Sequence, residues 1–426
     1  MRVLILGASG FIGSEVARRL ARDGHSVTGL ARSTSAVGRK LTFVKWVAAD
    51  LAQMTKNSDW VNLISGNDVI VNCAGALQDG LADNLTATQQ DATRALYEAC
   101  QLAGGRLIVQ ISARTSGAAE HLPFLRTKKA ADEALAASGL PHVILRPAIV
   151  LGRNAHGGSA LIRALASIPF SVPLVHADSP VQTVSLEDVA NAVSRAVDGM
   201  IDAGSDLHLA APQPVTLREL VSIHRRWLGL PDTKAISLPS IFAAPVSFLA
   251  DIAGRLGWRS PLRSTAIAVM SEGVIIDAEK SFITLQTAEQ TLANYPSGVQ
   301  DLWFARLYLI KPLIFVCLSV FWLLSGIIPL LGVGVAASHF LPFMSPIAAI
   351  SLTVATCLLD MLLGIAVLIK PLSRAALIGM LLVTASYLVG GTLLEPSLWL
   401  DPLGPLVKVL PSIALTVTGL AIFDER

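Results

Sequence analysis

The sequence Gly7-Ala8-Ser9-Gly10-Phe11-Ile12-Gly13 follows an apolar run over residues 3–6 and opens a helical pattern over residues 14–22. A glycine pattern in this position is typical of a turn that binds a dinucleotide. The first glycine allows a sharp turn, the second lets a pyrophosphate approach the backbone, and the third lets the helix pack closely on the sheet. Free N–H groups at the helix N-terminus would face the phosphates. We therefore predict a dinucleotide site at this turn.

Short apolar runs alternate with helical patterns through the first 150 residues. This alternation predicts a parallel sheet covered by helices on both faces. The predicted fold class is an α/β Rossmann-type, doubly wound domain at residues 1–230, which ends in a small lid region. Strands are expected at residues 3–6, 26–30, 42–47, 68–73, 106–111 and 142–145, and helices at residues 14–22, 86–101 and 127–137.

The composition changes near residue 307. Hydrophobic residues make up 53% of the 426 residues and charged residues only 15%, and the apolar excess lies in the C-terminal part. Apolar stretches there are long enough to cross a bilayer core of about 30 Å. The sequence predicts an all-α four-helix transmembrane bundle at residues 306–426, after a connecting region at residues 231–305. The spans are expected at residues 309–333, 346–369, 375–394 and 403–423.

The net charge is only +2 and no basic run is interleaved with aromatic residues, so nothing favours a nucleic-acid partner.

The distribution of positive charge indicates the orientation of these spans. The positive-inside rule places both termini and the Rossmann domain in the cytoplasm, at the cytoplasmic (inner) membrane. A start on a strand rather than on a leader peptide fits the same expectation. The cations on the expected inner side are Arg306, Lys311, Lys370, Arg374 and Arg426.

The residue after the second predicted strand indicates which dinucleotide is bound. NAD sites usually carry a carboxylate there, which accepts from the ribose 2′-hydroxyl. In this sequence Arg32 stands at that position, and a guanidinium pairs well with a 2′-phosphate. We therefore predict NADP(H) in preference to NAD(H). The alternative is that Arg32 is a solvated loop residue.

Several segments beyond the glycine turn resemble the short-chain dehydrogenase/reductase superfamily, in its extended and atypical branch. The resemblance covers about residues 1–230. It implies that Asp50 and Leu51 lie by the adenine, and that Ala74 and Gly75 line the ribose and phosphate side of the cofactor. The segments that carry it are residues 7–13, Ala49-Asp50-Leu51, Asn72-Cys73-Ala74-Gly75, Leu145-Arg146-Pro147 and residues 181–190.

The catalytic motif of this superfamily is incomplete in this chain. The superfamily uses Tyr-x-x-x-Lys on a helix and an upstream serine; the tyrosine moves a proton, and the lysine lowers its pKa and holds the ribose. The resemblance places Lys128 at the lysine, Ser112 at the serine and Phe124 at the tyrosine. A phenyl ring has no proton to transfer, which puts ordinary carbonyl reduction in doubt. As replacements, His121 is expected on an exposed loop and Tyr97 on a helix, facing solvent or a neighbour.

The C-terminal part resembles the DoxX-like membrane family at residues 387–392 and 398–408. That resemblance implies a redox role at the membrane and a quinone- or lipid-like partner. One hypothesis is therefore a membrane-bound NADP(H)-dependent oxidoreductase acting at the cytoplasmic face. Because of Phe124, the chain also resembles the nucleotide-holding accessory subunit of respiratory complex I. The second hypothesis is thus a non-catalytic NADP(H)-binding sensor or assembly subunit of a membrane redox complex.

Two charged residues lie within the predicted spans, Asp360 in the second and Lys408 in the fourth. Charges inside a membrane are costly and often functional. We expect Lys408 to reach the outer interface, toward Glu395 or Asp401, and Asp360 to pair with Lys311. A packing ion pair is one interpretation of Asp360. The other is a substrate site, which would support a third hypothesis, a small transporter regulated by the nucleotide.

Residues 207–220 are expected to supply the closing strand of the lid and the helix after it. Thr216 and Glu219 have the spacing of a capping box at the start of that helix. Farther on, Phe242, Val246 and Leu249 begin an apolar stripe at helical spacing, which continues through Ala253 and Leu256. We expect this stripe to face a core, with a helix lying on the bilayer surface as the alternative.

Overall fold

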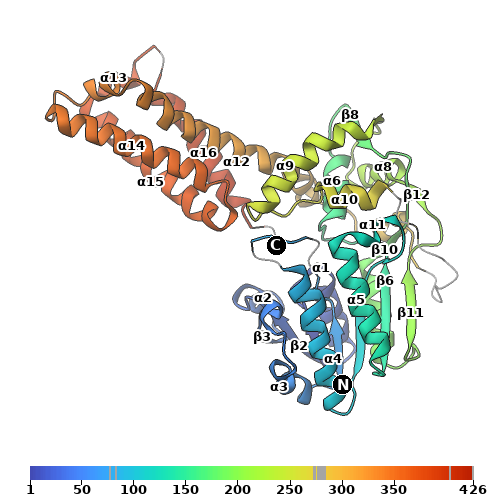
Figure 1. Cartoon of the computed structure of the whole chain (residues 1–426). Helices are drawn as coiled ribbons and strands as arrows, with labels where there is room; N and C mark the ends of the chain where they lie inside the picture. The colour runs from blue at the N-terminus through green and yellow to red at the C-terminus, as the bar shows by residue number, and fades with distance from the viewer. Residues whose placement is uncertain (76–77, 82–83, 272–274, 276–284, 403, 425–426) are drawn as a thin grey trace. The chain divides into compact units, whose positions relative to one another are not determined.

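The computed structural model of the chain describes residues 1–75, 78–81, 84–271, 275, 285–402 and 404–424 (Figure 1). The chain forms two compact units, which are described separately. The N-terminal unit comprises Met1–Gly254 and Ser260–Ala305, and the C-terminal unit comprises Arg255–Arg259 and Arg306–Arg426.

A seven-stranded sheet forms the centre of the N-terminal unit, in the order β11-β6-β5-β4-β1-β2-β3. All neighbouring strands are parallel. The order reverses between β1 and β4, which is where doubly wound folds bind their ligands. The predicted Rossmann-type fold is therefore confirmed. The strands are β1 (Arg2–Leu6), β2 (Ser26–Ala31), β3 (Lys45–Ala48), β4 (Val69–Asn72), β5 (Leu107–Ile111), β6 (His142–Pro147) and β11 (Ser205–Leu209).

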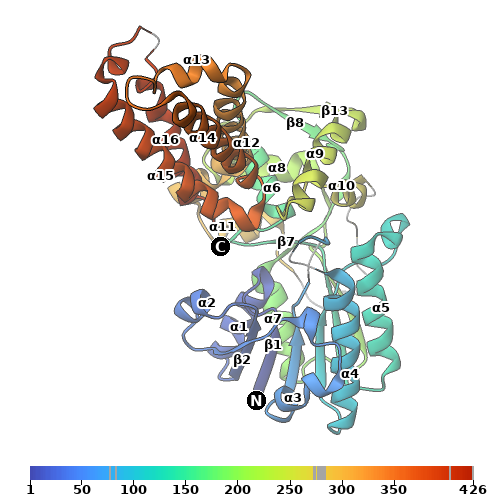
Figure 2. The ribbon, with the colours of Figure 1, turned by 60° about the vertical axis from the view of Figure 1, so that its left-hand side comes forward.

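Helices cover both faces of this sheet (Figure 2). Successive side chains of β1 point to opposite faces, so Val3 and Ile5 pack in one core cluster while Leu4 and Leu6 pack in the other. The fully buried Trp60 lies in the second cluster. The first face is covered by α1 (Phe11–Arg22) and α7 (Leu186–Val197), and the second by α3 (Val61–Ser65), α4 (Ala92–Leu102) and α5 (Pro123–Ala137).

Two helices begin earlier than the sequence pattern predicted. The helix α1 starts at Phe11, directly after the glycine turn, with Gly10 as its N-cap. The helix α5 starts at Pro123, since proline suits the first helical position, where its missing N–H is no loss. The predicted helix at residues 86–101 is a π-helical stretch, Thr86–Asp91, followed by α4. The early start of α5 places Phe124 and Lys128 on one helix.

The strand predicted to close the lid belongs instead to the main sheet. β11 pairs in parallel with β6, and its buried Leu207 and Leu209 join the core beneath α7. That prediction was wrong because strand alternation alone does not identify the sheet that a strand joins. The capping box of Thr216 and Glu219 is confirmed at the start of α8. The lid comprises β7 (Ile149–Leu151), α6 (Gly158–Ala166), β8 (Ser171–Val175), β9 (Pro180–Val181), β10 (Thr183–Ser185), β12 (Val215–Thr216), α8 (Leu217–Trp227) and β13 (Lys234–Leu238).

The apolar stripe after the lid lies on α9 (Ala243–Arg255) and on the 3-10 turn Ser240–Phe242 before it. Phe242, Val246 and Leu249 are exposed. The expectation that they face a core was wrong, because the buried face of α9 consists of small residues. Those residues are Ala243, Ser247, Ala250 and Gly254. Three further helices of this unit are α2 (Ser35–Lys40), α10 (Ser264–Ser271) and α11 (Ala288–Ala293).

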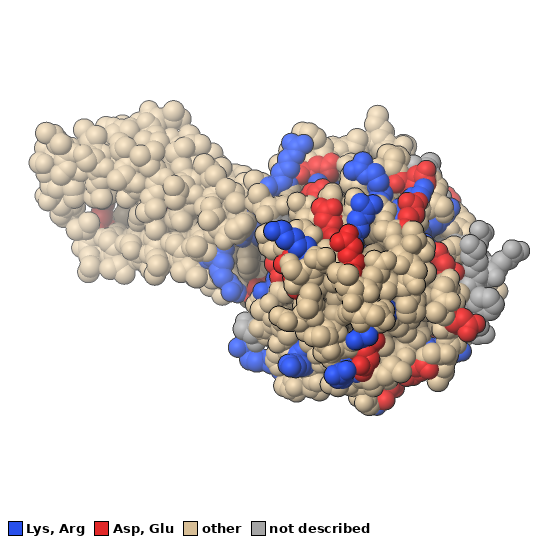
Figure 3. All heavy atoms as spheres, turned by 60° about the horizontal axis from the view of Figure 1, so that its bottom comes forward, with Lys and Arg blue, Asp and Glu red and all other residues tan. Residues whose placement is uncertain are grey.

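The C-terminal unit is helical and strongly apolar. Three of its described helices are long and apolar enough to cross a membrane, namely α12 (Val299–Leu331), α14 (Pro346–Ala366) and α15 (Lys370–Leu394). The fourth predicted span is shorter, a 3-10 turn Val407–Val409 followed by α16 (Leu410–Ala421), with Pro411 at the start of α16. A small helix, α13 (Val333–Ser338), follows α12. The face drawn in Figure 3 shows many charged side chains on the N-terminal unit and few on the C-terminal helices.

Asp360 has a different partner from the one predicted. Its Oδ1 accepts a hydrogen bond of 2.8 Å from the Tyr387 hydroxyl. Lys311 donates to the carbonyl oxygen of Phe423 at 2.9 Å, just beyond the end of α16. Cations commonly bind the free carbonyls at helix ends. The predicted Asp360–Lys311 pair was therefore wrong.

Lys408 is exposed on the turn Val407–Val409. Glu395, one of its two predicted partners, lies 3.6 Å from the Nδ1 of His339.

His224 of α8 leads to the first testable prediction. Its ring is 1% exposed and its Nδ1 contacts the Leu220 carbonyl at 2.9 Å. Burial lowers the pKa of His224 to about 4. Between pH 6.5 and about 4 the ring is therefore protonated in the unfolded chain but stays neutral in the folded chain. Between pH 6.5 and about 4 the free energy of unfolding should fall by about 3 kcal/mol for this group alone.

A chain with His224→Gln should lose this part of the acid sensitivity. Unfolding of the full chain in detergent, measured at pH 7 and pH 4.5, gives the difference between the two proteins at each pH. Equal pH dependence in both proteins would show that His224 is not the group that titrates.

Candidate functional site

Two glycines of the turn lie so close to other backbone atoms that a Cβ would not fit at either position. Gly7 has a φ of +69°, and a Cβ there would lie 2.9 Å from the Cα of Ala74. A Cβ on Gly13 would overlap the carbonyl oxygen of Gly7. No side chain caps the start of α1 at Gly10, which leaves the first N–H groups of the helix for a ligand. Ala8 is buried, and Ser9, Phe11 and Ile12 are half-buried.

The other predicted cofactor residues lie at the same edge of the sheet. The register pairs Leu6 with Leu30, so Arg32 follows β2 close to the level of the glycine turn, and it is exposed. Asp50 follows β3, where its Oδ1 accepts from Ala52 N at 3.2 Å. Leu51 packs partly buried against the second core cluster. The carboxyl ends of parallel strands meet at one edge, which explains this grouping.

The segment after β4 is held by a buried amide pair. Ala74 N donates to Asn72 Oδ1 at 3.0 Å, and Asn72 Nδ2 donates to Gln110 Oε1 at 2.9 Å. These bonds fix the backbone of Ala74 and Gly75 between the glycine turn and α5. A Cβ on Gly75 would lie 3.6 Å from the Nζ of Lys128.

Lys128 and Ser112 are brought together as predicted, although their roles remain predictions. Ser112 comes directly after β5 and is 6% exposed, and Lys128 is 5% exposed. The Lys128 Nζ donates to the carbonyl oxygens of Ile111, at 2.7 Å, and Ala74, at 3.3 Å. Burial lowers the pKa of Lys128, while the nearby Asp132 carboxylate opposes that shift.

The structure adds a buried ionic cluster that the sequence analysis missed. The Ser112 hydroxyl donates to Asp132 Oδ2, and the Arg146 guanidinium lies 2.8 Å from the same oxygen. Arg146 also binds both carboxylate oxygens of Asp206, at 2.7 and 3.0 Å. Burial raises the pKa of Asp132, and Arg146 and Ser112 oppose that rise. The Ser112 hydroxyl is thus hydrogen bonded to a buried carboxyl group.

A sequence signal for Asp132 existed. Phe124, Lys128 and Asp132 follow one another at intervals of four, which places them on one face of α5. Arg146 was visible within Leu145-Arg146-Pro147, but its pairing with Asp132 on α5 and with Asp206 on β11 could not be read from spacing alone.

No hydroxyl stands at the position of Phe124, which lies half-buried in the first turn of α5. Tyr97 is 3% exposed with its hydroxyl 3.5 Å from Gln110 Oε1, and burial raises its pKa. Neither feature suits a group that exchanges protons with a substrate. His121 is exposed, as expected, at the end of the short helix Ala118–His121. The structure also brings His156 to the glycine turn, with its ring centroid 6.1 Å from that of Phe11.

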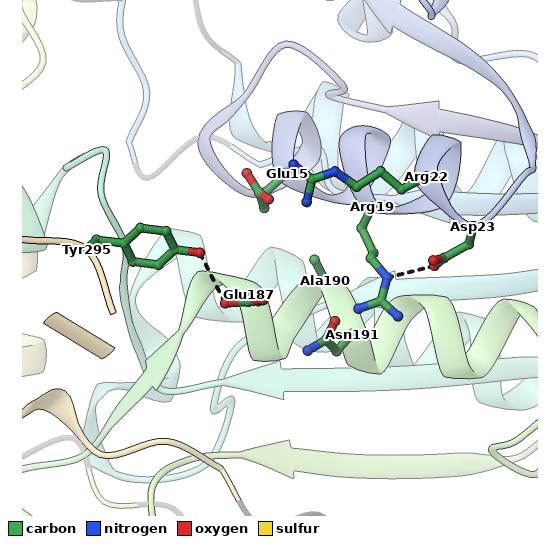
Figure 4. A pocket seen from close by; sticks show the side chains of 8 residues that line it. All are labelled: Glu15, Arg19, Arg22, Asp23, Glu187, Ala190, Asn191 and Tyr295. Carbon is green, nitrogen blue, oxygen red and sulfur yellow. Dashed lines mark hydrogen bonds and ion pairs between the residues drawn. The ribbon is translucent and has the colours of Figure 1, made fainter. Parts of the chain in front are cut away.

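A polar depression lies elsewhere on the N-terminal unit, between α1 and α7 (Figure 4). Four of the side chains that line it are paired with one another: Arg19 Nε donates to Asp23 at 2.7 Å, and the Tyr295 hydroxyl donates to Glu187 at 3.1 Å. None of the residues that line it is among the predicted cofactor residues. The glycine turn and the ends of the neighbouring strands therefore remain the candidate site.

The fold and the glycine turn define a Rossmann-type nucleotide-binding protein. Residues 7–199 match the model of a family described as NAD(P)H-binding, and residues 319–417 match the model of the DoxX-like family. The chain thus carries an NAD(P)H-binding domain similar to short-chain dehydrogenases/reductases, followed by a DoxX-like domain. Both predicted resemblances are confirmed. The DoxX-like match and the three apolar helices indicate a membrane protein.

Two solved structures share the fold. WbmH of Bordetella bronchiseptica, in complex with NAD+, is 19% identical with a TM-score of 0.52, over 68% of this chain and 95% of that chain. The dTDP-glucose 4,6-dehydratase of Bacillus anthracis, in complex with NAD, is 15% identical with a TM-score of 0.52, over 71% and 96%. These likenesses show the fold.

Two of the curated relatives that match the chain in sequence are these. An uncharacterized protein of Mycobacterium tuberculosis is 30% identical over 224 residues, which is 52% of this chain and 23% of that protein. The ceramide reductase of Caulobacter vibrioides is 28% identical over 190 residues, which is 44% of this chain and 58% of that enzyme. The chain therefore spans about a quarter of the first relative and just over half of the second.

The buried cluster leads to the second testable prediction. Arg146→Leu leaves the Asp132 carboxylate, whose side chain is 4% exposed, without its cation. Breaking a buried pair in this way should lower the free energy of unfolding by about 3–5 kcal/mol. Adding Asp132→Asn to Arg146→Leu should restore part of the loss, because the buried charge is then gone.

Unfolding of the full chain in detergent measures these changes. The matched control is Arg2→Leu, because Arg2 forms an exposed pair with Asp68 at 2.8 Å; little change is expected there. A loss no larger for Arg146→Leu than for Arg2→Leu would contradict the buried cluster.

Proposed function

We propose that this chain is a membrane-anchored NADP(H)-dependent oxidoreductase that acts on a lipid- or quinone-like substrate at the cytoplasmic face of the inner membrane. The proposal rests on one observation: the glycine turn, Lys128 and the Ser112–Asp132 pair lie together at one edge of the sheet. The DoxX-like domain of the same chain would hold this site at a membrane.

The cofactor would lie across the glycine turn. The free N–H groups at the start of α1 would bind the pyrophosphate, and Arg32 would bind the 2′-phosphate that distinguishes NADP(H). Asp50 and Leu51 would lie at the adenine, while Ala74, Gly75 and Lys128 would line the ribose of the nicotinamide. The nicotinamide supplies or accepts a hydride when the cofactor is bound.

Ser112 and Asp132 can supply the proton that Phe124 cannot. In the direction of reduction, the Ser112 hydroxyl would give its proton to the substrate oxygen that becomes an alcohol. Ser112 would recover a proton from Asp132, to which it is already hydrogen bonded. Asp132 rests as the carboxylate paired with Arg146, so it would take up a proton before this step; burial raises its pKa, while Arg146 and Ser112 oppose that rise. In the direction of oxidation, the same two groups would carry the proton the other way.

The substrate class follows from the membrane helices and from one relative. Ceramide reductase of Caulobacter vibrioides, by its name, acts on a lipid, and three apolar helices would hold the present site beside a lipid phase. A ceramide-class lipid is therefore the first substrate to test. A long-chain quinone is the second, since both are apolar molecules with a reactive carbonyl or hydroxyl group.

Phe124 favours a second candidate function, a non-catalytic NADP(H)-binding sensor or assembly subunit of a membrane redox complex. In that case Lys128 would bind the ribose without supporting proton transfer. The two candidates differ in one observable, which is turnover of bound NADPH.

Arg32 provides the third testable prediction, on cofactor choice. Arg32→Ala should raise the Kd of NADPH about 10- to 100-fold, because a charge-assisted bond to the 2′-phosphate is lost, and should leave the Kd of NADH nearly unchanged. Fluorescence titration of both cofactors against the full chain in nanodiscs measures this. Equal losses for both cofactors would refute the assignment of Arg32 to the 2′-phosphate.

The fourth testable prediction concerns the proton path. Asp132→Asn should keep NADPH binding but slow single-turnover oxidation of NADPH by ceramide-class ketones or quinones about 100-fold. Phe124→Tyr should speed the same step, because it returns a hydroxyl to the first turn of α5. Stopped-flow absorbance of bound NADPH reports both.

An unchanged rate in Asp132→Asn, at full cofactor occupancy, would remove the proposed path. Absence of NADPH oxidation by every substrate, in the native chain and in Phe124→Tyr alike, would instead favour the sensor.

A further inference from the structure

The turn before α9 and α9 itself expose a cluster of large apolar side chains. Six lie within twelve consecutive positions, with exposed fractions from 38% for Ile252 to 73% for Ile241. Isolated exposed apolar residues are ordinary, but a contiguous patch marks an interaction surface. We call this patch the α9 face; it consists of Ile241, Phe242, Val246, Phe248, Leu249 and Ile252.

The opposite side of α9 shows that the helix is properly packed. The residues buried on that side are the small residues Ala243, Ser247, Ala250 and Gly254. Asp251 is the sole ionisable residue between positions 241 and 254, and its Oδ1 pairs with Arg263 Nε at 3.1 Å. The α9 face therefore presents bulky apolar groups and no ionic group outside an ion pair.

The chain leaves α9 directly into the C-terminal unit, which begins with the turn Arg255–Arg259. Within that unit, Lys370 N donates to the Leu256 carbonyl at 3.0 Å, and Trp258 Nε1 donates to the Leu368 carbonyl at 2.6 Å. The Trp258 ring packs edge-on against Phe315 of α12, with centroids 4.7 Å apart. The C-terminal end of α9 is thus joined to a turn that packs against Phe315 of α12 and bonds to the segment that leads from α14 into α15.

This end of the C-terminal unit is rich in cations. Lys370 Nζ lies 5.1 Å from the centre of the Trp258 ring, and Arg374 pairs with Asp424 at 2.9 Å. Basic residues at the ends of membrane helices bind anionic lipid headgroups. The basic residues of the turn and of the neighbouring helix ends are Arg255, Arg259, Arg306, Lys311, Lys370 and Arg374.

We propose that α9 is an interfacial helix whose α9 face is buried in the headgroup–acyl boundary of an anionic leaflet. An apolar face of this kind, followed in the chain by Arg255 and Arg259 of a turn that packs against the apolar helix α12, fits the chemistry of that boundary. The proposal does not depend on catalysis: it gives the N-terminal unit a second attachment to the membrane whether or not the chain turns over NADPH.

Photo-crosslinking from Phe248 tests this. The photoreactive p-benzoylphenylalanine replaces Phe248 in the full chain, which is reconstituted in nanodiscs of phosphatidylcholine and phosphatidylglycerol and irradiated. The matched control is the same replacement at Phe43, an exposed phenylalanine of the N-terminal unit before β3, with exposed fractions of 65% for Phe248 and 48% for Phe43. We expect lipid adducts, detected by mass spectrometry, at least several-fold more abundant at position 248.

Other outcomes would overturn the proposal. Equal lipid labelling at both positions would show that labelling reports only the exposure of the side chain. A crosslink to a second copy of the chain would show that the α9 face is a protein interface. Solvent products alone would show that the α9 face is in contact with water. If the Phe248 variant fails to fold by thermal unfolding, Leu249→p-benzoylphenylalanine repeats the test on the same face. NADPH oxidation does not enter these readouts, so a failure here is distinct from a failure of the proposed oxidoreductase.

Discussion

The contact between Gly13 and the carbonyl oxygen of Gly7 determines the geometry of the candidate site. Any Cβ at position 13 would overlap that oxygen, so only glycine lets α1 begin directly at the edge of the sheet. The start of α1 then lies at the switch point between β1 and β4, where its N–H groups face outward. The same turn brings Gly7 against the backbone of Ala74, which links the first strand to the segment that lines the rest of the site.

The other half of the site depends on a buried cluster rather than on a turn. Asp132 binds both Ser112 and Arg146, and Arg146 binds Asp206 on the edge strand β11. Charges this far from water need close partners, because their desolvation is costly. The cluster therefore ties α5 to three strands, and it holds Ser112 in place even though the tyrosine that normally stands beside it is absent.

The sequence predicted the sheet well because each strand is short, apolar and followed by a helical pattern. It predicted the glycine turn, Ser112 and Lys128 from motifs that occupy a few consecutive positions. It missed Asp132, Arg146 and Asp206 as a group, because their contacts join residues 14 and 60 positions apart. The sequence pattern also assigned β11 to the lid, because strand alternation does not show which sheet a strand joins. It predicted that Phe242 and Leu249 face a core, because periodicity shows that a face is apolar but not what covers it.

The replacement of tyrosine by Phe124 separates two properties that the superfamily usually joins. In the function that we propose, binding needs the glycine turn, Arg32 for the 2′-phosphate and the ammonium of Lys128, and all of these residues lie at one edge of the sheet. Proton transfer needs a group that can give up and take back a proton beside the reacting oxygen. Ser112 contacts Asp132 and Arg146, and of these two only the carboxyl can do so, because a guanidinium stays protonated. The Asp132 carboxyl also has a structural role, since it pairs with Arg146 inside the buried cluster. We place catalysis ahead of passive binding because the same carboxyl is hydrogen bonded to Ser112, through which it would exchange protons with a substrate.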